Sequence, residues 1–269
     1  MDFLTVQSRR IEFVRLKANK TDKNANTNTP TIVMLHEGLG SIAMWRDFPQ
    51  QVADATGCEV LLYSRYGYGK SDPIEKSHTA DFMHKEALES LPDLLDQLNI
   101  RKPILFGHSD GGSIALIHAG GARCDLTGVI VLAPHVLVET LSITSIAAAK
   151  EAYLNSNLFE KLSKYHDNVD SAFWGWNDIW LHSEFLNWNI EEYLSTIVCP
   201  VLAIQGIDDE YGTMEQVDII SRKVKDVELL KLPQCRHSPH NDQLQAVLKA
   251  VATFVLKLIE SSDSKSGST

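Results

Sequence analysis

The chain has 269 residues, of which 44% are hydrophobic, 22% charged and 8% aromatic, and its 35 acidic against 25 basic side chains give a formal net charge of −10. This is the composition of a globular protein that can bury a full core without disulfides or metal ions. The acidic excess, with no dense cluster of Lys and Arg, argues against nucleic acid or an anionic membrane as a partner.

The predicted elements begin with a hairpin and continue as strands that alternate with helices. Phe3–Gln7 and Ile11–Leu16 alternate in character, as hairpin strands do, and the polar stretch Ala18–Pro30 predicts a loop. Apolar spacing typical of helices is found at residues 80–98, 112–122 and 242–259. Continuous apolar runs predict strands buried on both faces at residues 31–35, 59–63, 103–106, 128–132, 200–204 and 227–232. This alternation favours a three-layer α/β fold with a mostly parallel sheet of eight strands.

One interval, residues 137–197, has helical character and contains no convincing strand. We therefore predict a helical cap inserted into a core of residues 1–136 and 198–260, followed by a flexible Ser-rich tail at residues 261–269. Four of the five tryptophans fall in this predicted cap: Trp174, Trp176, Trp180 and Trp188.

The segment Gly107-His108-Ser109-Asp110-Gly111 matches the pattern G-x-S-x-G, and it follows a predicted strand and precedes a predicted helix. That context is the one that a nucleophile elbow requires. The small glycines permit a tight strand-to-helix turn, which raises the serine hydroxyl above the sheet and directs the helix N-terminus at developing negative charge. We therefore predict that Ser109 is a nucleophile.

A serine hydroxyl is a weak nucleophile until a base accepts its proton, so the chemistry requires a histidine and an acid. Asp208 and Asp209 follow the strand predicted at residues 200–204, and His237 and His240 follow the last predicted strand. The order serine, acid, histidine agrees with a nucleophile elbow.

With these motifs the chain resembles the α/β-hydrolase fold superfamily over nearly its whole length, from Leu35-His36-Glu37-Gly38 to the last helix. The resemblance implies an α/β-hydrolase fold, a catalytic serine at Ser109, Asp209 as the acid of the triad and His237 as its base.

For three positions the sequence is compatible with more than one interpretation. His240 is a competing base or a second histidine at the start of the final helix, and Glu139 is an alternative acid or a solvated cap residue. Arg236 is a solvated surface residue, or it favours a substrate carboxylate or modulates His237.

A tetrahedral intermediate also needs hydrogen-bond donors for its oxyanion. One is the backbone N–H of Asp110, directly after the nucleophile. The resemblance implies a second donor in the loop after His36, at Gly38 or Leu39. Glu37 occupies the place where the superfamily usually has glycine, and its role stays open.

The aromatic residues of the cap predict an apolar pocket above the nucleophile, with a small-molecule substrate as the partner. The residues expected to bind substrate are Trp45, His135, Trp174, Trp176 and Trp180.

No stretch resembles a signal peptide, and no uncharged run approaches the ~18–20 residues that cross a bilayer, so we expect a cytoplasmic protein. Cys58, Cys124, Cys199 and Cys235 are far apart, and none forms a C-x-x-C pair. We expect reduced, buried thiols, no metal and no cofactor. A homodimer stays open.

The predicted function is that of a serine hydrolase which cleaves a small, largely apolar ester or related acyl compound through an acyl-enzyme on Ser109. The alternatives on the same residues are a C–C bond hydrolase, an acyltransferase or a peptidase. A slow-turnover ligand-binding receptor of the same fold is the alternative of another class.

Overall fold

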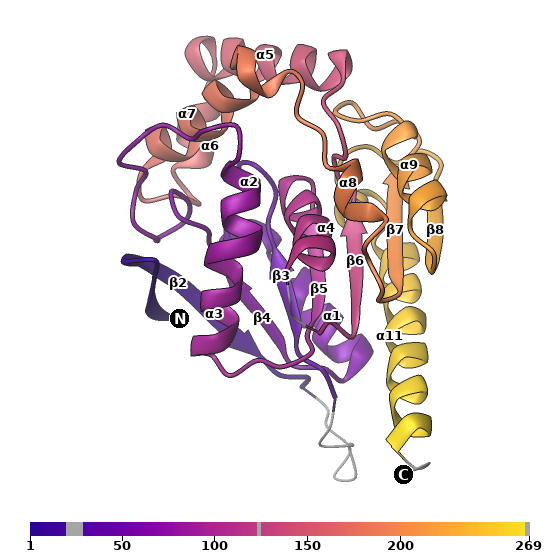
Figure 1. Ribbon diagram of the computed structural model, residues 1–269. Coiled ribbons are helices and arrows are strands. Elements are labelled where there is room, and N and C mark those ends of the chain that lie inside the picture. Colours follow the sequence, from indigo (N-terminus) through magenta and orange to yellow (C-terminus); the bar gives the residue numbers. More distant parts are fainter. Residues whose placement is uncertain (20–28, 123–124, 267–269) are drawn as a thin grey trace.

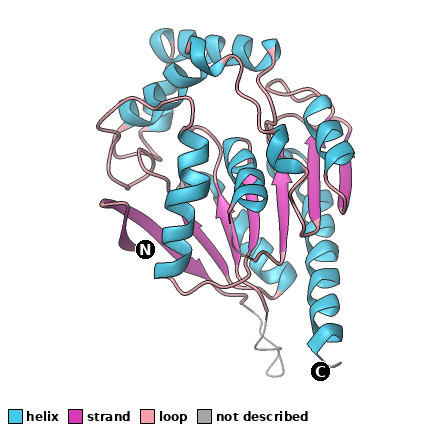
Figure 2. Cartoon of the chain, in the orientation of Figure 1, coloured by secondary structure: helices cyan, strands magenta, loops and turns pink. Residues whose placement is uncertain are grey.

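The computed structural model describes residues 1–19, 29–122 and 125–266, and these fold around one central sheet (Figure 1 and Figure 2). Its eight strands lie in the order β1-β2-β4-β3-β5-β6-β7-β8. The pairs β1·β2 and β2·β4 are antiparallel, and all the others are parallel. The strands are β1 (Asp2–Val6), β2 (Arg9–Leu16), β3 (Ile32–Leu35), β4 (Val60–Tyr63), β5 (Ile104–His108), β6 (Gly128–Leu132), β7 (Val201–Gly206) and β8 (Val227–Leu232). The predicted mostly parallel sheet of eight strands is confirmed.

Helices cover both faces of the sheet, so the strands from β3 to β7 are buried along their whole length. Successive side chains of a strand point to opposite faces. Along β5, Leu105 packs into the core under α2, α3 and α4, whereas Ile104 and Phe106 pack under α1 and α11. The covering helices are α1 (Phe48–Thr56), α2 (Phe82–Lys85), α3 (Leu91–Gln97), α4 (Asp110–Gly121) and α11 (Leu244–Ser266).

Two helices lie where none is predicted, α1 and α9 (Glu215–Lys223). Both have nine residues, fewer than the roughly 11–18 over which helical periodicity is usually recognised, and both bury one face. The helix predicted at residues 80–98 is present as a continuous helical run made of α2, a π-helical turn η2 (Glu86–Ser90) and α3.

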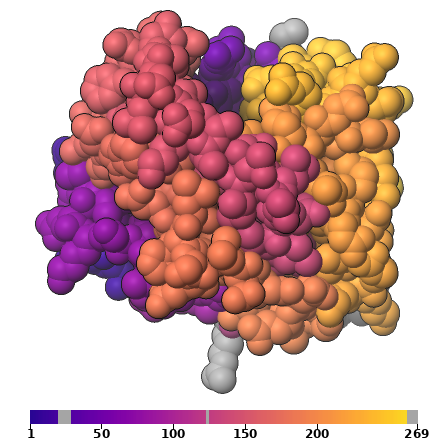
Figure 3. Space-filling model, turned by 90° about the horizontal axis from the view of Figure 1, so that it is seen from above, coloured from indigo at the N-terminus to yellow at the C-terminus, as the bar shows by residue number. Residues whose placement is uncertain are grey.

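The interval expected to form a cap lies between β6 and β7 and is helical. Its elements are α5 (Thr140–Asn155), α6 (Leu158–Leu162), α7 (Val169–Trp180), the 3₁₀ turn η3 (Ser183–Phe185) and α8 (Glu191–Leu194). Figure 1 shows α5, α6 and α7 above the carboxyl ends of the central strands, and Figure 3 looks down on this layer. The short α8 instead packs beside α4 and α9.

The C-terminal region differs from the predicted flexible tail. After α10 (Pro239–Asp242), α11 continues through Ser266, so residues 261–266 are helical. Adding residues to an existing helix costs little free energy, and the first helix-breaking residue in the sequence, Gly267, lies outside the described residues. Residues 20–28 of the predicted loop also lie outside the described residues. No described helix combines the length and the apolar character needed to cross a bilayer.

Candidate active site

Ser109 lies in the sharp turn between β5 and α4. Its φ of 53° and ψ of −121° are strained for a residue with a side chain. A Cβ at Gly107 would lie 2.1 Å from the carbonyl oxygen of Gly111, and a Cβ at Gly111 would lie 2.1 Å from that of Leu35. The two glycines of the motif are therefore required by close backbone contacts, and the turn presents the serine above the carboxyl edge of the sheet.

The structure brings the three residues predicted as a triad together. His237 Nε2 lies 2.9 Å from Ser109 Oγ, and His237 Nδ1 lies 2.9 Å from each carboxylate oxygen of Asp209. Asp209 follows β7 and His237 follows β8, so neighbouring parallel strands deliver both loops to the same edge of the sheet. The histidine is thus within hydrogen-bonding distance of both partners.

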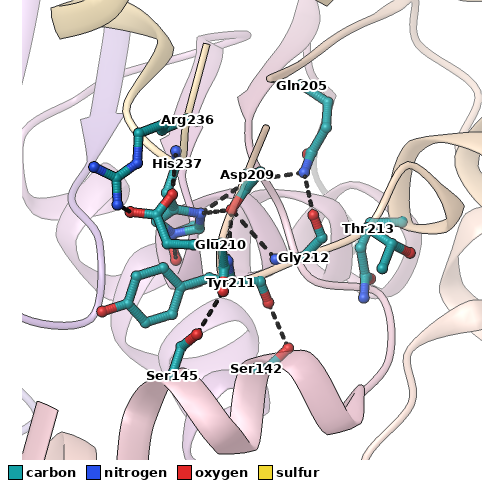
Figure 4. A network of polar contacts seen from close by, with 12 residues as sticks. Ser142, Ser145, Gln205, Asp209, Glu210, Tyr211, Gly212, Thr213, Arg236 and His237 are labelled. Atoms are coloured by element: carbon teal, nitrogen blue, oxygen red, sulfur yellow. Dashed lines mark hydrogen bonds and ion pairs between the residues drawn. The ribbon is translucent and has the colours of Figure 1, made fainter. Parts of the chain in front are cut away.

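Hydrogen bonds from its own loop hold the Asp209 carboxylate (Figure 4). Gln205 Nε2 donates to it at 2.8 Å, and the backbone N–H groups of Tyr211 and Gly212 donate at 2.8 Å and 3.2 Å. Burial alone would raise the pKa of Asp209, but the hydrogen bond and charge of His237 together with the Tyr211 N–H lower it below its ordinary value. The carboxylate is therefore ionised, and it is oriented toward His237.

The alternative acid and base lie elsewhere. Glu139 accepts hydrogen bonds from the backbone and side chain of Thr213 and from Gln216 Nε2. His240 is buried against Trp45 and Phe48, with ring centroids 5.1 Å and 5.2 Å away. Neither side chain takes the place that Asp209 and His237 occupy beside the nucleophile.

The loop after β3 carries the predicted second oxyanion donor. Gly40 N–H donates to the carbonyl of Glu37 and closes a turn around Gly38 and Leu39. A Cβ at Gly38 would lie 2.2 Å from Trp176 Nε1, so the indole of α7 packs directly on this glycine. The Arg65 guanidinium donates to the carbonyl oxygens of His36 and Glu37 and braces the loop from the other side.

Asp110 is the first residue of α4, and its backbone N–H follows the nucleophile as predicted. Its carboxylate is 1% exposed, and neither oxygen has a hydrogen-bond partner among the described residues. Burial raises the pKa of this group to about 6, against the opposing effects of the Arg65 charge and of the neighbouring Trp180 indole. The site therefore contains a buried carboxylate that no described residue satisfies by a hydrogen bond.

Three of the residues predicted to bind substrate lie near the candidate site, one of them beside His237. His135 lies 5.7 Å from His237 between ring centroids and packs against Trp180 at 4.9 Å, while Trp176 covers Gly38. Burial, followed by the nearby charge of His237, lowers the pKa of His135 to about 3, so its imidazole is neutral.

Tyr211 belongs to the site but was not among the predicted residues. Its ring lies 4.7 Å from that of His237, and its backbone N–H binds Asp209. The one signal in the sequence is its place two residues after the acid.

Two predicted pocket residues do not reach this space. Trp45 is 3% exposed and packs with Phe48 and Phe106 in the core beneath α1 and α11, because the η1 turn (Ile42–Trp45) directs its side chain inward. Trp174 lies against Tyr153 and lines a surface groove of about 700 Å³ between the cap and residues 74–78. Trp45 is therefore a core residue, and Trp174 faces an outer groove rather than the candidate triad.

Arg236 is engaged by the acid loop rather than left without a partner. Its guanidinium lies 2.9 Å from the carboxylate of Glu210, which also accepts the His237 N–H at 3.2 Å (Figure 4). The Arg236–Glu210 pair therefore connects the loop that carries His237 to the loop that carries Asp209. Among the described residues, no group of three or more His, Cys, Asp or Glu is arranged to hold a metal ion.

A family model described as "Alpha/beta hydrolase family" matches residues 32–250. The 2-hydroxy-6-oxononadienedioate/2-hydroxy-6-oxononatrienedioate hydrolase of Cupriavidus pinatubonensis is 33% identical over 119 residues, which is 44% of this chain and only 38% of that protein. The proline iminopeptidase of Saccharolobus solfataricus is 26% identical over 87% of this chain and 86% of its own length. The enol-lactonase structure from Burkholderia xenovorans LB400 superposes with a TM-score of 0.74 at 16% identity, over 95% of this chain and all of that one.

Proposed function

Because this chain belongs to the α/β hydrolase family, we propose that it is a serine hydrolase that cleaves a small, largely apolar ester or related acyl compound through an acyl-enzyme on Ser109. The observation that carries the proposal is the continuous contact from Ser109 through His237 to Asp209, with both links at 2.9 Å. The aromatic side chains of α7 support an apolar acyl group.

In the proposed reaction, His237 Nε2 accepts the hydroxyl proton while Ser109 Oγ attacks the acyl carbon. The carbonyl electrons move onto the oxygen, which accepts hydrogen bonds from the backbone N–H of Asp110 and from Gly38 or Leu39. The tetrahedral intermediate collapses, and the alcohol leaves with the proton from His237. Water, deprotonated by His237, then releases the acid and restores Ser109. Asp209 stabilises the imidazolium in both halves.

The buried Asp110 carboxylate favours a second candidate, the cleavage of an aminoacyl ester or amide. An unpartnered carboxylate next to the nucleophile can accept hydrogen bonds from a substrate ammonium, and relatives named proline iminopeptidase agree with such a substrate. The two candidates differ in the acyl group and share the same attack by Ser109.

The test is turnover of matched p-nitrophenyl esters by the wild type and the Ser109→Ala variant. Steady release of p-nitrophenol that is lost in the variant, whose circular dichroism stays unchanged, supports the proposal. Equal turnover by both proteins contradicts it. If the wild type prefers an alanyl to a propionyl ester and Asp110→Asn loses this preference, the aminoacyl candidate is supported. If the wild type shows no preference, the apolar acyl candidate is supported.

A further inference from the structure

An ion pair between the partly exposed Glu37 and the buried His108 lies beside the candidate nucleophile. Glu37 follows β3, and His108 ends β5 directly before Ser109. His108 Nδ1 lies 3.5 Å from Glu37 Oε2, and the His108 side chain is 1% exposed. The other ring nitrogen, Nε2, lies 2.7 Å from the backbone carbonyl oxygen of His237. One imidazole therefore contacts the loop of Gly38 on one side and the loop of His237 on the other.

Two features of the surrounding residues hold the Glu37 side chain beside His108. A Cβ at Gly40 would lie 2.5 Å from Glu37 Oε2, so the carboxylate folds over a position that has no side chain. The Arg65 guanidinium donates to the Glu37 carbonyl at 3.1 Å and fixes the backbone of the same residue. The carboxylate is thus directed inward, and its side chain keeps only 24% exposure.

The charges of the pair agree with its geometry. Burial opposes ionisation of both groups, but the nearby His108 lowers the pKa of Glu37 far below its usual value, and Glu37 in turn raises the pKa of His108. Protonated histidine has two N–H donors, which suits a carboxylate on one side and the His237 carbonyl on the other.

The other titratable groups around His108 complete its environment. The rings of His237 and His240 lie 5.3 Å and 5.0 Å away, Asp209 adds negative charge from the loop after β7, and His135 lies beyond His237. The pKa of His135 and of His240 is lowered to about 3, each chiefly by burial, so both of these imidazoles are neutral.

We propose that Glu37 and His108 are positioning residues that hold the loop after β3 and the His237 loop together at Ser109. The role rests on the proposed function, since it acts on the groups that carry the reaction. Glu37 and His108 do not themselves contact the reacting atoms.

The positioning role is tested by kcat and KM for a p-nitrophenyl ester. His108→Asn removes the donor to the His237 carbonyl and lowers kcat about tenfold or more with little change in KM, whereas His108→Gln loses less. Glu228→Gln, which breaks the exposed Lys257–Glu228 pair, is the matched control and changes neither constant. Equal effects of the Asn and Gln variants overturn the positioning role.

The pairing itself is tested by NMR titration of the His108 ring, whose signal is identified by its absence in His108→Gln. Glu37→Gln keeps the size of the partly exposed side chain and lowers the pKa of the His108 ring, which tests the pair even if a His108 variant does not fold. An unchanged His108 titration in Glu37→Gln overturns the pairing. This titration needs no turnover, so the expected shift in a protein without esterase activity contradicts the proposed function alone.

Discussion

His237 Nδ1 lies 2.9 Å from both carboxylate oxygens of Asp209. A single N–H can serve both oxygens only if the proton of the neutral imidazole sits on Nδ1, and this leaves Nε2 free to accept from Ser109 at 2.9 Å. The carboxylate therefore selects the tautomer that the proposed reaction needs.

Asp209→Asn removes this selection, because the amide can donate to Nδ1 and favour the wrong tautomer. We expect kcat for ester hydrolysis to fall by ~10³–10⁴-fold with the fold intact. Glu139→Gln is the matched control, since Glu139 binds Thr213 and Gln216. A larger loss of kcat in the control would instead favour Glu139 as the acid.

His237→Gln and His240→Gln separate the two histidines that follow β8. We expect the first to lower kcat at least ~10³-fold, because no base then accepts the Ser109 proton. The second is expected to stay within about tenfold of the wild type, because His240 packs against Trp45 and Phe48. The measurement is kcat at saturating ester, and a reversed order would assign the base to His240.

Asp110→Asn changes the pH dependence of stability. Burial raises the pKa of Asp110 to about 6, so the folded protein holds a proton between pH ~4 and 6 that the unfolded chain has lost, and stability falls as pH rises through that window. Above pH 7 the ionised carboxylate costs up to about 3 kcal/mol.

The Asp110→Asn variant has no ionisable group at this position, so it does not lose stability in this way as the pH rises. Its melting temperature relative to the wild type should therefore be higher at pH 8 than at pH 4. Thermal unfolding at the two pH values, followed by circular dichroism, measures the difference. An equal offset at both would mean that Asp110 titrates as an exposed carboxyl does.

Gly38→Ala places a methyl group against the Trp176 indole, where a Cβ would lie 2.2 Å from Nε1. Either α7 or the oxyanion loop must move, so we expect kcat/KM to fall about tenfold or more and unfolding to cost ~1–3 kcal/mol less free energy. The double variant G38A/W176F has room for the methyl group and should recover part of both losses. Absence of any recovery would show that the contact with Trp176 is not the cause.

Much of the fold and the placing of the candidate triad can be predicted from the sequence because both depend on local patterns in a fixed order. Apolar runs mark the buried strands, and the G-x-S-x-G motif between a strand and a helix marks Ser109. Since parallel strands end at one edge, Asp209 and His237 follow from their places after β7 and β8.

Side-chain direction could not be predicted in the same way. Trp45 and Trp174 are aromatic residues in the expected regions, but packing turns one into the core and the other toward an outer groove. The Glu37–His108 pair joins residues that are far apart in the sequence, so no spacing rule indicates it.

The most direct test of the central claim is covalent capture of the nucleophile. The wild type, Ser109→Ala and His237→Gln are incubated with a fluorophosphonate, and the modified residue and the rate of modification are determined by mass spectrometry. We expect one adduct on Ser109 in the wild type, none in Ser109→Ala and a modification rate at least ~10²-fold lower in His237→Gln. No adduct on Ser109, or an equal rate without His237, would contradict the proposal that Ser109 is a nucleophile activated by His237.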